Sequence, residues 1–280
     1  MRRRARLCAV VVMAVLAAVP ALAQPALTIG GVTAAPGTTA SGDLVVAARG
    51  TEPGTTIPFS IVNGARPGPV LALIAGTHGA EYPPILALQR LRASIDPKEL
   101  SGAILMVHVA NMPAFLGRAV YYTPGDGKNL NRVFPGRADG TISERIAEVL
   151  TREIIDRSQY LVDLHCGDGN ESLRHYLYWE TTGSAPLVDA IHRLALAFGL
   201  DHIVIDGSRP TDAAASLYLS NTAVTRGKPA ITIESGALGQ SDEESIARIE
   251  RGVAGVLRHL EMRTFGPGPV EHPVYLGRNE

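Results

Sequence analysis

Short apolar runs alternate with helix-compatible segments along most of the chain after residue 55. Runs of ~4–8 apolar residues bounded by turn residues are typical of buried strands. They predict strands at 57–62, 70–75, 103–109, 160–164, 175–179, 202–205 and 230–233. The segments between them predict helices at 84–94, 143–157, 185–198, 213–225 and 242–262. Because strands and helices alternate, we expect an α/β fold with a mixed, mostly parallel sheet that helices cover on both faces.

Turn residues indicate how the chain enters this sheet. Residues 63–68 separate the first two predicted strands and favour an antiparallel hairpin. Upstream, residues 24–53 are rich in Gly, Ala, Thr and Pro and show no sustained helical period. We interpret them as a loosely structured lead-in with one edge strand near 44–48.

The first 23 residues have the pattern of a secretory signal peptide. Four arginines precede an apolar run at 7–19, and Ala21-Leu22-Ala23 forms a small-x-small cleavage signature. The alternative is a retained membrane anchor, but the apolar run is shorter than the ~20 residues that a spanning helix needs. We therefore expect cleavage after Ala23, export to the periplasm or the medium, and no membrane association of the mature chain.

Charge and cysteine content exclude two classes of partner and one kind of cross-link. The formal net charge is −1 and no basic stripe occurs, which argues against nucleic acids and anionic membranes as partners. Cys8 lies in the predicted signal peptide and leaves Cys166 alone, so the mature chain forms no internal disulfide.

Polar residues gather where predicted strands end, the place where ligands bind in open α/β sheets. His78 and Glu81 follow the strand at 70–75, and His165 follows the strand at 160–164. If the chain is already helical at residue 78, the first two side chains project from the same side because they are three residues apart. Two histidines and one carboxylate are a common ligand set for catalytic zinc, which keeps an open position for water. The sequence therefore predicts one bound Zn²⁺.

A carboxylate and two kinds of donor complete the candidate chemistry. Glu234 directly follows the strand at 230–233 and is our candidate general base, with an ion pair closing the strand end as the alternative. The long loop at 110–140 contains Asn131 and Arg132, whose amide and guanidinium suit a substrate carboxylate. Arg118, in the same loop, is either an oxyanion-stabilising residue or a surface arginine.

These motifs resemble, in the same order, those of the succinylglutamate desuccinylase and aspartoacylase family of the zinc carboxypeptidase superfamily. The resemblance covers residues 69–262 and rests on His78, Glu81, Asn131, Arg132, His165 and Glu234. It implies zinc ligation by His78, Glu81 and His165, general-base and proton-shuttle chemistry by Glu234, a carboxylate clamp of Asn131 and Arg132, and an oxyanion-stabilising Arg118. The implied reaction is hydrolysis of an N-acyl amino acid or a related amide.

Two features depart from the family pattern. Described members mostly work in the cytoplasm, whereas this chain begins with an export signal. Members also continue into a smaller β-rich domain. We therefore expect 24–265 to form the hydrolase domain, and 266–280 to be a linker and the start of such a β-rich domain.

Two further functions remain open at this point. An exported zinc carboxypeptidase that trims short peptides would use the same site, and substrate length separates it from a deacylase. A non-catalytic metal- or solute-binding protein is the third reading, although such a protein has no need for Glu234 beside the metal.

Overall fold

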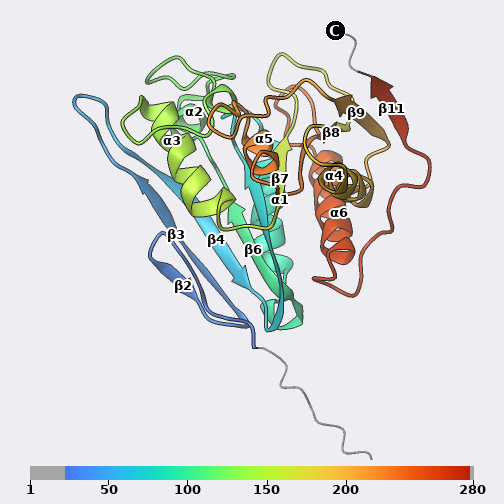
Figure 1. Cartoon of the computed structure of the whole chain (residues 1–280). Helices are drawn as coiled ribbons and strands as arrows, with labels where there is room; N and C mark the ends of the chain where they lie inside the picture. Colours follow the sequence, from blue (N-terminus) through green and yellow to red (C-terminus); the bar gives the residue numbers. More distant parts are fainter. Residues whose placement is uncertain (1–22, 278–280) are drawn as a thin grey trace, which may run out of the picture.

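The apolar runs form one twisted sheet of nine strands in the part of the chain that this computed structural model describes, residues 23–277 (Figure 1). The strand order is β11-β9-β8-β10-β7-β5-β6-β4-β3. The strands are β3 (Thr38–Val46), β4 (Thr55–Asn63), β5 (Arg66–Ala75), β6 (Ser101–Val107), β7 (Tyr160–His165), β8 (Tyr176–Glu180), β9 (His202–Asp206), β10 (Ala230–Glu234) and β11 (Val274–Gly277).

The centre of the sheet is parallel and its edges are mixed. β6, β5, β7 and β10 run in one direction, while β4 and β8 pair antiparallel to the outer two of them. The four central strands are nearly continuous runs of buried apolar residues, as expected for parallel strands that are covered on both faces. The predicted fold class is confirmed.

The predicted hairpin between the strands at 57–62 and 70–75, which are β4 and β5, is wrong. β6 lies between β4 and β5 and pairs with both. The connecting turn does not close on itself, because Gly64 donates its N–H to the Gly102 carbonyl and Arg66 donates to the Leu100 carbonyl. The start of β6 therefore takes the backbone groups that a hairpin would have used.

Helices cover both faces of the sheet. On one face α6 (Glu243–His259) lies between α1 (Tyr82–Ser94) and α4 (Ala185–Phe198), and on the other α5 (Leu219–Val224) packs on β7 and β10 (Figure 1). The remaining helical elements are short: η1 (Pro97–Glu99), α2 (Met112–Gly117), η2 (Leu130–Arg132), α3 (Ile142–Leu150) and the π-helical turn η3 (Thr151–Ile155).

Two predicted helices differ from the observed ones. The helix predicted at 143–157 divides into α3 and η3. The helix predicted at 213–225 begins only at Leu219, because Leu217 has a positive φ of 65° and exchanges two backbone hydrogen bonds with Phe134. A continuous helix could not make that exchange.

Each end of the described chain adds strands outside the predicted alternation of strands and helices. β1 (Leu27–Ile29) and β2 (Val32–Ala34) form a hairpin, so the prediction of a loosely structured lead-in is wrong there. β11 lies within 266–280, the segment predicted to hold a linker and the start of a β-rich domain, and it pairs parallel with β9 at the edge of the main sheet. The further β-rich domain stays a prediction.

Residues 1–22, which contain most of the predicted signal peptide, lie outside the described residues. Within residues 23–277, no helix combines the length and the apolar character that a membrane crossing requires.

Candidate active site

The register of two parallel strands brings the first pair of site residues together. In β7 and β10, His165 lies opposite Glu234, and Asp163 lies opposite Thr232. Since side chains alternate along a strand, all four project from the same face of the sheet. This is the face that α5 covers, because the Thr232 hydroxyl hydrogen-bonds to Ser220 of α5.

A tight turn after β5 places the second pair. Gly76 has a φ of 69°, which only glycine adopts easily, and a Cβ at Gly79 would lie 2.2 Å from the backbone of Ala114. Helix α1 begins only at Tyr82, so His78 and Glu81 meet through this turn and not through the helical spacing that the sequence suggested.

The three predicted metal ligands converge on one point. Glu81 lies between the two histidines, with Oε1 2.7 Å from His78 Nδ1 and Oε2 2.9 Å from His165 Nδ1. One ligand atom from each residue lies within 4.8 Å of the others, and Glu81 and His165 are buried. The same nitrogen of each imidazole therefore faces the shared carboxylate.

The other imidazole nitrogens are held by neighbouring side chains. His78 Nε2 lies 3.1 Å from Asn129 Oδ1, and His165 Nε2 lies 3.0 Å from Asp163 Oδ1. Partners of this kind fix the orientation and the tautomer of metal-binding histidines, leaving Nδ1 free to coordinate. The arrangement therefore fits a divalent metal ion such as zinc.

Electrostatics at this cluster favours a positive charge. Burial would lower the pKa of His165, but Asp163 and Glu81 outweigh it and raise that pKa well above its usual range. Burial would likewise raise the pKa of Glu81, yet His165 and His78 hold it at about 2. A divalent cation supplies the charge that these carboxylates favour while both imidazoles stay neutral, as ligation requires.

Glu234 has the features expected of a group that exchanges protons. Its Oε2 is buried and has no hydrogen-bond partner among the described residues. Burial raises its pKa well above the usual range, and nearby Glu81 and Asp163 act in the same direction, whereas His165 opposes them. No cation pairs with it among residues 23–277, so the alternative of an ion pair at the strand end lacks its partner.

Asn131 and Arg132 lie beside the cluster on η2. Asn131 Nδ2 is 3.5 Å from His165 Nε2, and its Oδ1 accepts a hydrogen bond from the backbone N–H of Leu219. Arg132 is exposed, and its guanidinium lies over the ring of Tyr218 at 4.7 Å. Arg209 covers the same ring at 3.9 Å, so two guanidinium groups flank one aromatic side chain.

Arg118 is the predicted site residue that the structure does not tie to the cluster. It is exposed at the end of α2 and makes no side-chain hydrogen bond or ion pair with another described residue. Its φ is 48°, and Tyr121 in the same loop has a φ of 64°, a costly conformation for side chains with a Cβ. Tyr121 packs edge-on against His78, with ring centroids 6.0 Å apart.

Sequence reasoning assigned no role to Asp168, which the structure places beside the cluster. It is fully buried, and neither carboxylate oxygen has a hydrogen-bond partner in the described chain. Burial, together with Glu81 and Glu171, raises its pKa to about 7. Its position three residues after His165 was visible in the sequence, but its lack of a partner was not.

The geometry agrees with what the comparisons with known proteins show. The model of the succinylglutamate desuccinylase/aspartoacylase catalytic domain matches residues 67–260. The chain belongs to this family. The match includes both histidines, both glutamates and the Asn131-Arg132 pair.

One similar protein is the N-alpha-acetyl-L-2,4-diaminobutyric acid deacetylase of Halomonas elongata, which is 34% identical over 205 residues. The alignment covers 72% of this chain and 58% of that protein, so the chain spans less than two thirds of the length of this relative.

Solved structures of similar proteins share the fold. The product-bound ectoine utilization protein EutE from Ruegeria pomeroyi is 28% identical with a TM-score of 0.75, covering 86% of this chain and 73% of that chain. A succinylglutamate desuccinylase from Silicibacter sp. TM1040 is 27% identical with a TM-score of 0.74, covering 85% and 71%.

Proposed function

We propose that this protein is a zinc-dependent hydrolase that removes the acyl group from a small N-acyl amino acid. The observation that carries the proposal is the convergence of His78, Glu81 and His165 through one shared carboxylate, next to Glu234, whose Oε2 is buried and has no hydrogen-bond partner among residues 23–277. A binding protein would hold a metal with the first three residues alone.

Each residue has a distinct task in this reaction. His78, Glu81 and His165 would hold a zinc ion, which when bound would supply Lewis acidity toward the acyl carbonyl and a lowered pKa of water. Glu234 accepts the proton of the attacking water at Oε2 and delivers it to the leaving amino nitrogen. Asn129 and Asp163 keep the two imidazoles in the tautomer with Nδ1 directed at Glu81.

Substrate recognition follows from the charges around the cluster. Arg132 offers a planar fork of donors for the α-carboxylate, and its stacking on Tyr218 limits its motion. Asp168 is buried, and its two oxygens have no hydrogen-bond partner in the described chain, so they would accept hydrogen bonds from a cation that reaches them. We therefore infer an N-acyl diamino acid as the substrate class, in agreement with the substrate that the name of the Halomonas relative states.

A substrate comparison tests this proposal. Zinc-loaded protein should hydrolyse N-acetyl-2,4-diaminobutyrate faster than N-acetylalanine and faster than a dipeptide. Asp168→Asn should raise KM for the first substrate by about tenfold or more, since a buried charge-assisted hydrogen bond contributes ~1.5–3 kcal/mol. It should leave KM for N-acetylalanine unchanged.

Two outcomes contradict the proposal. Preferential release of C-terminal residues from peptides would indicate a carboxypeptidase. Equal KM changes for both acetylated substrates would remove Asp168 from amine recognition.

We also propose that the chain is exported, because its first 23 residues have the signal-peptide pattern. Mass spectrometry of the protein from the cell envelope or the medium should show Gln24 as the first residue. An intact Met1 there would indicate a retained anchor.

A further inference from the structure

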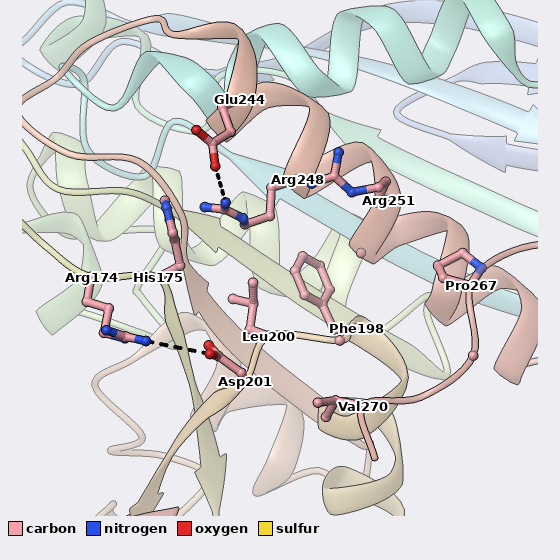
Figure 2. A pocket seen from close by; sticks show the side chains of 13 residues that line it. Arg174, His175, Phe198, Leu200, Asp201, Glu244, Arg248, Arg251, Pro267 and Val270 are labelled. Atoms are coloured by element: carbon pink, nitrogen blue, oxygen red, sulfur yellow. Dashed lines mark hydrogen bonds and ion pairs between the residues drawn. The ribbon is translucent and has the colours of Figure 1, made fainter. Parts of the chain in front are cut away.

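A cavity with a volume of about 720 Å³ lies away from His78, Glu81 and His165. It is bounded by α6, the end of α4 and the residues that follow it, residues 174–175 just before β8, and the segment 267–270 (Figure 2). None of the predicted site residues lines it. The segment 267–270 is fixed in place, because Val270 donates its backbone N–H to Leu196 of α4. The volume of the cavity lies within the usual range of small-molecule sites, roughly 300–1,000 Å³.

One side of the cavity carries arginine donors that are not fully used. Arg248 pairs with Glu244 through one nitrogen, while its Nη1 is buried and has no partner in the described chain. Arg251 is exposed and makes no hydrogen bond or ion pair with another described residue. The two residues are three apart on α6 and so lie on the same side of the helix.

The third arginine of the cavity is already engaged. Arg174 Nη2 lies 3.6 Å from Asp201, and its Nε donates to His202 Nδ1 at 3.2 Å. Figure 2 shows this pair on the side of the cavity opposite α6. The donors that can receive a ligand are therefore those of Arg248 and Arg251.

The floor of the cavity is apolar and closely fitted. Phe198 and Leu200 are 3% and 4% exposed. Gly252 lets the Phe198 ring lie against α6, because a Cβ at this position would come within 2.4 Å of the ring. A hydrated inorganic ion gains nothing from contact with an apolar surface, whereas the hydrocarbon part of an organic acid is stabilised there because it leaves water.

We propose that this cavity binds a small organic acid, with its carboxylate on Arg248 and Arg251 and its apolar body on Phe198 and Leu200. A carboxylate accepts two parallel hydrogen bonds from a guanidinium and would satisfy the buried Nη1. The proposal does not depend on the deacylase reaction.

His175 gives the cavity a contact with the active-site strand. It lines the cavity, and its Nδ1 accepts a hydrogen bond from the backbone N–H of Gly236 and lies 3.3 Å from the Ser235 hydroxyl. These residues directly follow Glu234. A carboxylate bound beside Arg248 therefore changes the electric field at the His175 ring, which contacts the residues that follow β10. The resonances of this ring therefore indicate whether the cavity is occupied.

Calorimetric titration of the full chain with hexanoate tests the proposal, with hexanamide as the neutral probe of equal shape and inorganic phosphate as the ion alone. Hexanoate should bind at least tenfold more tightly than either. Arg248→Gln combined with Arg251→Gln should weaken hexanoate binding by about tenfold or more. The His175 ring resonances should shift on titration of the unaltered protein.

Two control variants separate this site from others. Arg152→Gln removes an exposed arginine of η3 and should leave hexanoate binding unchanged. Arg132→Ala should also leave it unchanged, because that residue lies beside the metal cluster. Arg251→Gln alone, at an exposed position, should give a smaller loss without any risk to folding.

Several results would overturn the proposal. They are no saturable binding of hexanoate, equal binding of hexanamide, no loss in the double variant, or loss in Arg132→Ala, which would assign hexanoate to the deacylase site instead.

Discussion

Two histidines at the same edge of the sheet have opposite electrostatic surroundings. His165 ends β7, and His108 follows β6, with only β5 between these strands. His165 faces Asp163 and Glu81, which raise its pKa. His108 contacts the Ser60 hydroxyl through Nε2 at 2.8 Å, and burial together with Arg92 lowers its pKa to about 4.

The difference teaches that a histidine at a strand end is not by itself a ligand candidate. Burial lowers the pKa of both rings, so the charges of the neighbours decide the outcome. Carboxylates around His165 favour a bound cation. Arg92, which donates to Ser41 and Ser60 beside His108, disfavours one.

The largest expected effect concerns Glu234, which lies beside the predicted metal ligands. Glu234→Gln removes the proton acceptor and should lower kcat by roughly 10²–10⁴-fold while zinc content stays the same, as expected for a positioned general base. His108→Gln is the matched change at the other histidine and should retain kcat. Steady-state kinetics on an N-acyl amino acid measures both, and near-normal turnover of the first variant would remove Glu234 from the mechanism.

A smaller effect should follow from loosening one imidazole. Asp163→Asn keeps the size of the side chain but weakens its hold on His165, and should reduce zinc affinity about 10–100-fold. Ser60→Ala makes the corresponding change beside His108. Competition with a chelating dye measures the zinc affinity of each variant. Equal zinc affinity in Asp163→Asn and the unaltered protein would argue against this orienting role.

The smallest effect should appear in the pH dependence of stability. The pKa of His108 is lower in the folded chain than its ordinary value of 6.5, so the unfolded chain binds more protons between pH 6.5 and about 4. The contribution of His108 to the free energy of unfolding is therefore full above pH 6.5 and falls as the pH drops through this window. Urea unfolding should show a flatter profile there for His108→Gln, and identical slopes would refute the assignment.

Local patterns predicted the elements better than their arrangement. α4 has the predicted bounds of 185–198, because it is an amphipathic segment that ends at a glycine with positive φ. The place of β6 between β4 and β5 was not predictable from turn residues, since it depends on hydrogen bonds from Gly64 and Arg66 to residues some 35 positions away.

The same distinction holds for the site. His78, Glu81 and His165 stand out because strand ends of parallel sheets converge. Arg209 and Asp168 do not, because their relevance depends on a shared Tyr218 ring in one case and on missing hydrogen-bond partners in the other. Only tertiary contacts reveal either property.

The central claim is that His78, Glu81 and His165 together hold one metal ion, whereas His108 and its neighbours hold none. The direct test is zinc content after dialysis, by plasma mass spectrometry, for the unaltered protein, Glu81→Gln and His108→Gln, with thermal unfolding to verify that each is folded. We predict one zinc per chain in the unaltered protein and in His108→Gln, and no zinc in Glu81→Gln. Full zinc occupancy in folded Glu81→Gln, or loss of zinc in folded His108→Gln, would contradict the account.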